Sequence, residues 1–227
     1  MGCPSDDTVS PTGDGMSDLA KKLAGRFLVV DGPDGAGKST QLRLLADWLR
    51  GQGLAVTETR DPGGTAVGDR IRTILLDNAH GEMSVGCEVL LYMASRTQLM
   101  AEVIRPAMES DQCVLCDRWV SATVAYQGAG GTDPKSVLAM YELALPGIRP
   151  DLTIILDLPA ETGLQRVSAS RGHDRMEAKG LEFHRRVRAL FLHQAREHPD
   201  RFAVADAAGS VEDVQARLRQ ILNRWHG

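Results

Sequence analysis

Runs of apolar and β-branched residues indicate five strands along the chain. Each run has the length of a strand and is bounded by polar or turn-forming residues. The five runs are Arg26–Asp31, Leu54–Arg60, Gln112–Asp117, Asp151–Asp157 and Arg201–Ala205.

Between these strands, apolar residues recur at helical spacing. Leu42, Leu45 and Leu49 follow the first strand, and Gly51 then offers a C-terminal stop. Further helices are predicted at Val67–Leu76, Glu88–Met108, Val120–Gln127, Ser136–Leu145, Glu161–Ser168, Leu181–Glu197 and Val211–Arg224. Alternating strands and helices predict an α/β fold of three layers, with a central parallel sheet of about five strands covered by helices on both faces.

The first 25 residues differ in composition from the rest. They contain Gly, Pro, Ser, Asp and Thr with little apolar content, so we expect a disordered leader over 1–25 and a single domain over 26–227. The leader lacks the apolar core of a signal peptide and the basic character of a transit peptide. We therefore expect a cytoplasmic protein.

Composition narrows the range of partners. Hydrophobic residues make up 43% of the 227 residues, enough for a full core, and the net charge is −4. This charge argues against bulk binding to nucleic acid or to an anionic membrane, and no apolar run approaches the ~20 residues of a membrane span. Cys113 and Cys116 lie three apart in a strand, so their side chains should face opposite ways, as buried thiols in a reducing compartment.

One loop carries a clear chemical signature. Residues 32–39 match the phosphate-binding pattern G-x-x-x-x-G-K-[ST], with a strand before them and a helix after them. Backbone N–H groups of such a loop converge on phosphate oxygens, Lys38 can reach the outer phosphates, and the Ser39 hydroxyl can ligate Mg²⁺. Asp117, at the end of a buried strand, is the second candidate ligand for Mg²⁺. The residues predicted to bind the phosphates of a nucleoside triphosphate are Gly32, Pro33, Asp34, Gly35, Ala36, Gly37, Lys38, Ser39 and Thr40.

Two further stretches follow this loop in a fixed order. They are Thr59–Thr65, which reads TRDPGGT, and Asp117-Arg118 with the later Ala125–Gly128, which reads AYQG. In this combination the chain resembles thymidylate kinase, the P-loop nucleoside monophosphate kinase that moves the γ-phosphate of ATP to dTMP. The resemblance runs from about Arg26 to the last strand. It implies the P-loop kinase fold with a short mobile lid, Mg²⁺ as cofactor, and a homodimer.

The resemblance also implies a role for each residue of a dTMP site. Arg60 and Arg118 would grip the monophosphate, Tyr92 would lie against the thymine ring and Arg96 would bind the edge of the base. The full set is Asp34, Arg60, Tyr92, Arg96, Arg118, Thr123, Tyr126 and Gln127. Tyr126 would favour a deoxyribose. Taken singly, Tyr92 fits core packing equally well, and the arginines fit ordinary surface charges.

Phosphoryl transfer needs positive charge on the migrating group. Some thymidylate kinases place an arginine within the phosphate loop, where this chain has Gly35, so a lid at about 168–178 should supply the charge. Arg171 and Arg175 are the candidates, with Arg166 as a third; alternatively Arg175 is structural and held by Glu177 or Asp174. The predicted catalytic residues are Lys38, Asp34, Arg118, Arg171 and Arg175.

The predicted activity is a direct, in-line phosphotransfer from ATP to dTMP, with three alternatives. A deoxynucleoside kinase would leave Arg60 and Arg118 without an anion to bind. A GTPase-type switch would need an N-K-x-D element, which the sequence lacks after the loop. A catalytically idle nucleotide-binding module is disfavoured by Lys38, Ser39 and Asp117. The helix at Glu88–Met108 could form the dimer interface or pack in the core.

Overall fold

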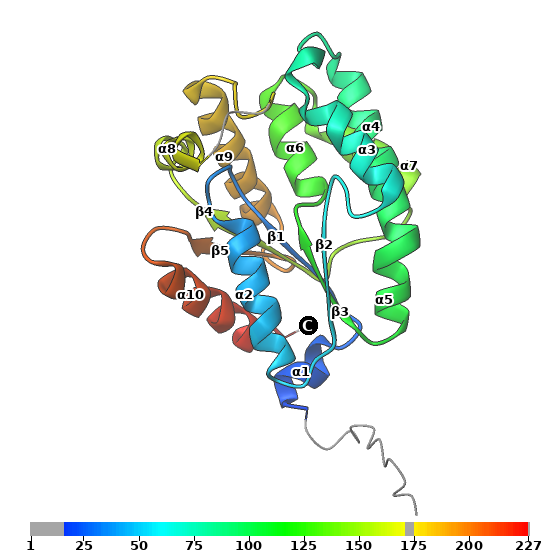
Figure 1. Ribbon diagram of the computed structural model, residues 1–227, viewed down its shortest axis with the longest axis vertical. Coiled ribbons are helices and arrows are strands. Elements are labelled where there is room, and N and C mark those ends of the chain that lie inside the picture. Colours follow the sequence, from blue (N-terminus) through cyan, green and yellow to red (C-terminus); the bar gives the residue numbers. More distant parts are fainter. Residues whose placement is uncertain (1–15, 171–174, 227) are drawn as a thin grey trace, which may run out of the picture.

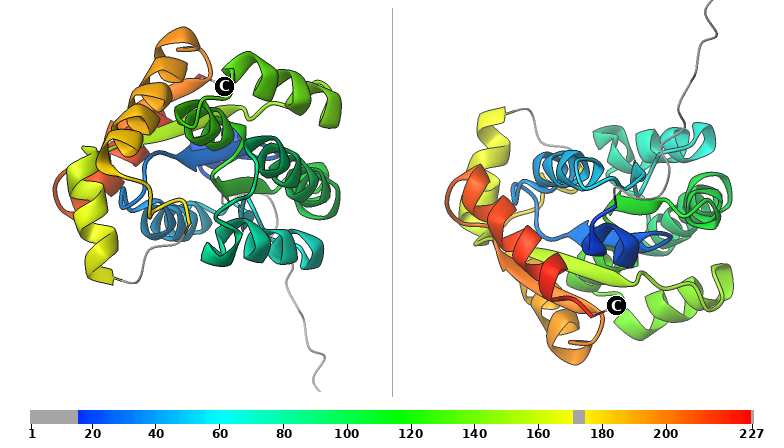
Figure 2. Two further views of the ribbon diagram at one scale, coloured as in Figure 1. Left: turned by 90° about the horizontal axis from the view of Figure 1, so that it is seen from above. Right: turned by 90° about the horizontal axis from the view of Figure 1, so that it is seen from below.

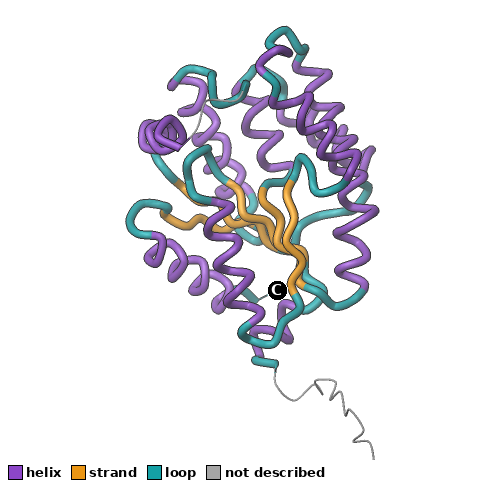
Figure 3. The backbone as a smooth tube through the Cα atoms, in the orientation of Figure 1, coloured by secondary structure: helices purple, strands orange, loops and turns teal. Residues whose placement is uncertain are grey.

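A single five-stranded sheet forms the centre of the molecule, as predicted. The structure is a computed structural model that describes residues 16–170 and 175–226. All strands run parallel in the order β2-β3-β1-β4-β5 (Figures 1 and 3). Their bounds are β1 Phe27–Asp31, β2 Val56–Arg60, β3 Cys113–Asp117, β4 Leu152–Asp157 and β5 Phe202–Asp206.

Helices cover both faces of this sheet, which makes three layers (Figure 2). The predicted helices are all present, with ends shifted by a few residues at most. The helices are α1 Asp18–Leu23, α2 Lys38–Arg50, α3 Ala66–Leu76, η1 Asn78–His80, α4 Val85–Leu99, η2 Met100–Ile104, α5 Arg105–Glu109, α6 Val120–Ala129, α7 Pro134–Ala144, α8 Ala160–Ser170, α9 Leu181–Glu197 and α10 Val211–Arg224.

Alternating side chains of the strands divide the core between the two faces. Leu28 and Val30 of β1 pack with α1, α2 and α10, whereas Phe27 and Val29 pack with α4, α6 and α7. The cysteines of β3 follow the same rule. Cys113 lies in the first cluster and Cys116 in the second, both buried and free, so the predicted opposite orientation is confirmed.

The long helix expected at Glu88–Met108 is a continuous helical run of three parts. Between α4 and α5, the five residues of η2 form a π-helical turn. Pro106 explains this change of winding, because proline has no N–H to donate and its ring crowds the carbonyl one turn earlier.

The predicted disordered leader, residues 1–25, includes a segment that is folded. Residues 18–23 form α1, which Ser17 caps by accepting a hydrogen bond from the Ala20 N–H. Ala20 and Leu23 are fully buried against the core, so this short helix belongs to the folded domain. Six residues are too few for a periodic pattern to reveal. Residues 1–15 lie outside the described residues.

The sheet places three predicted site positions at one edge. Arg60 at the end of β2 pairs with Asp117 at the end of β3, and Asp117 is in register with Val30 of β1. The phosphate loop, which follows β1, therefore begins beside Asp117 and one strand away from Arg60, at the carboxyl edge where ligands of open α/β sheets bind.

Candidate active site

A cavity of about 470 Å³ opens at this carboxyl edge. Its wall is built from the phosphate loop, the end of β2, and helices α3, α4 and α6. All eight residues of the predicted dTMP site line it, together with Gly35, Gly37, Lys38, Ser39 and Thr40 of the loop. Gly32, Pro33 and Ala36 are buried within the loop. Residues from distant parts of the sequence thus share one cavity of ligand size.

Gly35 explains why the loop of this chain carries no arginine. Its φ is +75°, and a Cβ added there would lie 2.2 Å from the Gly163 carbonyl oxygen of α8. No real contact is that short, so a side chain at this position would push the phosphate loop away from α8.

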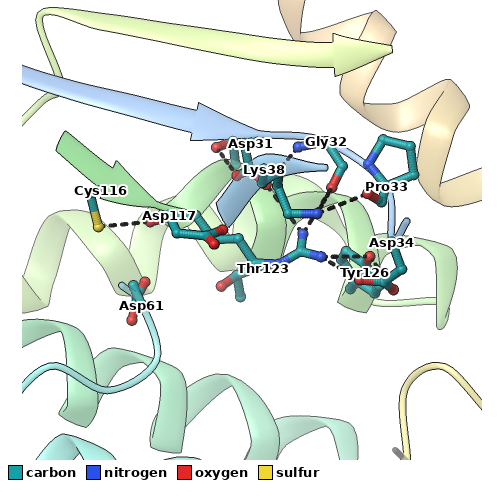
Figure 4. Close-up of polar contacts among 12 residues, drawn as sticks. Asp31, Gly32, Pro33, Asp34, Lys38, Asp61, Cys116, Asp117, Thr123 and Tyr126 are labelled. Carbon is teal, nitrogen blue, oxygen red and sulfur yellow. Dashed lines mark hydrogen bonds and ion pairs between the residues drawn. The ribbon is translucent and has the colours of Figure 1, made fainter. Parts of the chain in front are cut away.

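Lys38 turns back onto its own loop (Figure 4). Its Nζ donates to the carbonyl oxygens of Gly32, at 3.1 Å, and Pro33, at 2.8 Å. Burial, with a further contribution from the charge of Arg118, lowers the pKa of Lys38 to about 8. The ammonium is thus held beside the loop by two neutral acceptors, and a phosphate would be a stronger partner.

Ser39 and Asp117, the predicted Mg²⁺ ligands, are brought together. The Ser39 hydroxyl donates to Asp117 Oδ2 across 2.6 Å. A hydroxyl and a carboxylate are oxygen donors that suit Mg²⁺, which usually completes its octahedral shell with water and substrate phosphate oxygens. Among the described residues no cluster of three or more His, Cys, Asp or Glu side chains could hold a metal by itself. The oxygen pair therefore fits a nucleotide-bound Mg²⁺.

Arg118 connects the phosphate loop to the acceptor side of the cavity. Its Nη2 donates to Asp34 Oδ1, at 2.5 Å, and to the Tyr126 hydroxyl, at 3.2 Å, while Tyr126 donates to Asp34 Oδ2 at 2.6 Å (Figure 4). Burial acts to raise the pKa of Asp34, but the charges of Arg118 and Lys38 outweigh it and lower that pKa. The three side chains form a closed, charge-assisted cluster.

A second carboxylate, Asp31, contacts the guanidinium of Arg118. Asp31 is fully buried and accepts hydrogen bonds from the Gly32 N–H, at 2.8 Å, and the Ser121 hydroxyl, at 2.6 Å. Arg118 Nη1 also approaches Asp31 Oδ1 at 3.3 Å. The backbone of Arg118 has a φ of +71°, a conformation that non-glycine residues rarely adopt. The guanidinium reaches the phosphate loop, where Nη1 also donates to the Gly32 carbonyl oxygen at 3.0 Å. Sequence reasoning could not anticipate the positive φ.

Arg96 is almost fully buried beneath the cavity. Its Nε donates to Asp61 Oδ2 at 2.6 Å, and its Nη2 donates to Thr123 Oγ1 at 2.9 Å. The guanidinium lies 5.2 Å from the centre of the Trp119 ring, which is itself fully buried. Asp61 Oδ1 is buried without a hydrogen-bond partner among the described residues. Asp61 thus acts as the counter-ion that holds Arg96 in place.

Three more side chains complete the acceptor end. Arg60 is exposed and pairs with Asp69 at 3.1 Å, and Tyr92 is half-buried in the wall of the cavity. Arg72 also lines the cavity, and its Nη1 donates to the Pro62 carbonyl oxygen at 3.0 Å. Sequence analysis missed Arg72; its position one turn before the end of a predicted helix, close behind the TRDPGGT stretch, was the available signal.

The predicted lid residues have different environments. Arg175 is buried, does not line the cavity, and pairs with Glu88 of α4. Arg166 of α8 is exposed, and its Nη1 donates to the Gly35 carbonyl oxygen at 3.3 Å. Arg171 lies outside the described residues. These contacts favour the structural alternative for Arg175, but neither side chain's catalytic role is tested by them.

Fold and cavity together define a class of protein: a P-loop kinase, with a phosphate loop that faces an arginine-lined pocket across one cavity. Comparisons with known proteins agree. The family model described as "Thymidylate kinase" matches residues 30–218. A thymidylate kinase of Pseudomonas syringae pv. tomato is 45% identical over 201 residues, which cover 88% of this chain and 96% of that protein.

Two further relatives extend the comparison. A thymidylate kinase of Caulobacter vibrioides is 46% identical over 199 residues, covering 87% of this chain and 96% of the relative. The crystal structure of thymidylate kinase from Ehrlichia chaffeensis superposes with a TM-score of 0.71 at 28% identity, covering 87% of this chain and 98% of that one. The chain therefore belongs to the thymidylate kinase family, whose members are phosphotransferases.

Proposed function

We propose that this protein transfers the γ-phosphate of ATP to dTMP and releases dTDP and ADP. The observation that carries the proposal is the Asp34–Arg118–Tyr126 cluster. It joins the phosphate loop to the acceptor end of a single cavity through contacts of 2.5 to 3.2 Å. Family membership supports the same reaction.

The two ends of the cavity bind different nucleotides. At the donor end, the loop N–H groups and Lys38 bind the ATP phosphates. At the acceptor end, Arg118 and Arg60 bind the dTMP phosphate, for which the planar guanidinium offers paired donors. Tyr92, Arg96, Thr123 and Gln127 surround the base, and Tyr126 excludes a ribose 2′-hydroxyl.

The transfer itself needs no enzyme nucleophile. An oxygen of the dTMP phosphate, already anionic, forms the new bond to the γ-phosphorus as the bond to the β–γ bridging oxygen breaks, and ADP leaves with that electron pair. Lys38 and Arg118 offset the negative charge of the equatorial oxygens. Ser39 and Asp117 would hold Mg²⁺, which supplies charge neutralisation on the phosphates when bound.

Arginines near the loop are proposed to complete the charge neutralisation. Arg171 is still predicted to supply part of this positive charge. Among the described residues Arg166 is already at the phosphate loop, through its bond to the Gly35 carbonyl. Arg175 is held by Glu88, so its proposed contribution depends on release from that pair.

We also propose a homodimer in the cytoplasm. Val67 and Ile74 of α3 and Leu90 of α4 are 49%, 42% and 61% exposed, which places apolar side chains on the outer surface of two packed helices. Such side chains suit burial against a second copy. The described cysteines are all free, as in a reducing compartment. No helix in the described part of the chain is long and apolar enough to span a membrane.

A coupled ADP-release assay tests this function. Purified protein with ATP and Mg²⁺ should turn over dTMP far faster than dCMP, dAMP or dGMP, and thymidine should not react. Rapid turnover of thymidine would instead identify a deoxynucleoside kinase. Nucleotide hydrolysis without any acceptor would favour a switch.

A further inference from the structure

A second cavity, separate from the catalytic cavity, lies among α6, α7, α9 and the amino ends of β4 and β5. Its volume is about 370 Å³, which is within the range of small-molecule sites. Among the described residues the two cavities share one lining residue, Trp119. No residue assigned above to ATP, dTMP or Mg²⁺ lines the second cavity. A molecule bound there would therefore not occupy the place of either substrate.

Apolar side chains from three helices and a strand line the second cavity. Val120, Leu138, Leu190 and Phe202 are among them, and each of these residues is partly exposed to solvent. An apolar body placed between them would remove their exposed surface from water, which is favourable. The concave shape and the apolar lining thus suit the body of a small ligand.

Two arginines at the opening of this cavity add positive charge. The side chains of Arg149 and Arg201 are 43% and 39% exposed, and both residues line the cavity. They pair with Glu142 and Asp200, exposed carboxylates that do not line it, and Glu197 is the one carboxylate among the described lining residues. A guanidinium carries five N–H donors, so these pairs leave donors for a further anion. The opening therefore favours a ligand with an anionic group.

Two aromatic rings connect the second cavity with the catalytic cavity. Trp119 is fully buried and its Nε1 donates to the Tyr141 hydroxyl at 2.9 Å. The Arg96 guanidinium, in the catalytic cavity, lies 5.2 Å from the centre of the Trp119 ring. The Arg149 guanidinium, in the second cavity, lies 5.4 Å from the centre of the Tyr141 ring. These four side chains form a continuous packed row from one cavity to the other.

We propose that the second cavity is a ligand site for a small aromatic anion, and that its occupancy is linked to dTMP binding through Trp119 and Tyr141. The aromatic body lies among the apolar side chains, and the anionic group lies at Arg149 and Arg201. The site goes beyond the proposed function, whereas its linkage to dTMP rests on that function. Because linkage is reciprocal, each ligand should change the dissociation constant of the other by the same factor, about fivefold or more.

Fluorescence titration of the full chain with anilinonaphthalene sulfonate tests the site. This probe has an aromatic body and one anionic group, and its emission rises in apolar surroundings. Leu138→Asp should weaken its binding about tenfold or more, because the change removes apolar contact and adds a like charge. The matched control is Leu143→Asp, on the same helix but 83% exposed and outside the cavity, which should leave binding unchanged.

Phenylnaphthylamine, which has the same rings without the sulfonate, tests the contribution of charge. Arg201→Gln should weaken binding of the sulfonate about fivefold and leave binding of the neutral probe unchanged. Arg196→Gln, on the exposed surface of α9 and outside the cavity, is the control and should alter neither. If Leu138→Asp does not fold, Arg201→Gln decides: an equal effect on both probes, or none on either, overturns the inference.

Titration of the sulfonate at increasing dTMP distinguishes linkage from competition. The dissociation constant of the probe should reach a plateau about fivefold from its starting value, and saturating probe should change the dTMP constant equally. A probe constant that rises without limit would show binding in the catalytic cavity and overturn the inference, as would a constant that dTMP leaves unchanged.

Sedimentation of Leu138→Asp tests whether a second copy covers the cavity instead. The oligomeric state should match that of the unaltered protein, and dissociation of an oligomer would overturn the inference. Absence of dTMP binding in the unaltered protein would count against the proposed function, and the two probes would still test the site.

Discussion

The low pKa of Lys38 makes ATP binding sensitive to alkaline pH. The free protein holds Lys38 in a buried site where its pKa is about 8, and a bound phosphate should raise that value because it favours the ammonium. The complex then binds more protons than the free protein, so affinity must fall as pH rises. The charged fraction drops from about three quarters at pH 7.5 to about 3% at pH 9.5 for a pKa of about 8. ATP affinity should weaken about 25-fold over this interval, or about 2 kcal/mol.

Fluorescence or calorimetric titration with a non-hydrolysable ATP analogue and Mg²⁺ between these pH values checks the prediction. Above pH 7.5 the analogue's own phosphates are fully charged. Lys38→Met should bind the analogue weakly, with no pH dependence. At high pH the affinity of the unaltered protein should fall toward that of Lys38→Met. Lys38→Arg should also give a flat profile. An unaltered protein whose affinity stays constant from pH 7.5 to 9.5 would refute the buried-lysine argument.

Three further changes test other parts of the site. Tyr126→Phe should lower the preference for dTMP over UMP about tenfold in kcat/KM, because the hydroxyl near the sugar is lost; an unchanged ratio would remove Tyr126 from sugar selection. Gly35→Ala should destabilise the protein more than Gly37→Ala in urea unfolding. Both positions have positive φ, which costs about 1–2 kcal/mol, but only the first would also place its Cβ against backbone. Ser121→Ala removes a 2.6 Å hydrogen bond to buried Asp31 and should cost about 1.5–3 kcal/mol of unfolding free energy, whereas a loss below about 0.5 kcal/mol would show that the bond contributes little.

Local patterns were sufficient for the strands and for most of the helices. Strands β1, β3 and β4 are short buried runs, mostly of apolar residues, and α9 and α10 have the bounds that their periodicity predicts, because burial on one face repeats regularly along a helix. The order β2-β3-β1-β4-β5 depends on contacts between distant segments and could not be deduced from these patterns alone. The helix α1 was missed because its stability comes from packing of Ala20 and Leu23 against the core.

In the site, too, local sequence predicted some features, whereas others depend on contacts between distant segments. The phosphate loop could be located because its chemistry requires fixed residues in consecutive positions, and the acceptor residues because of a family resemblance. The partners of these residues could not be predicted: Asp61 opposite Arg96 and Glu88 opposite Arg175 are each brought together across different elements. The steric block at Gly35 likewise depends on where α8 passes over the loop.

A crystal structure with dTMP and a non-hydrolysable ATP analogue tests the central claim most directly. The account predicts the terminal phosphate of the analogue at Lys38 and the dTMP phosphate at Arg118 and Arg60, with the two phosphates facing each other and thymine between Tyr92 and Gln127. A dTMP molecule bound away from Arg118, or with its phosphate turned from the phosphate loop, would contradict it.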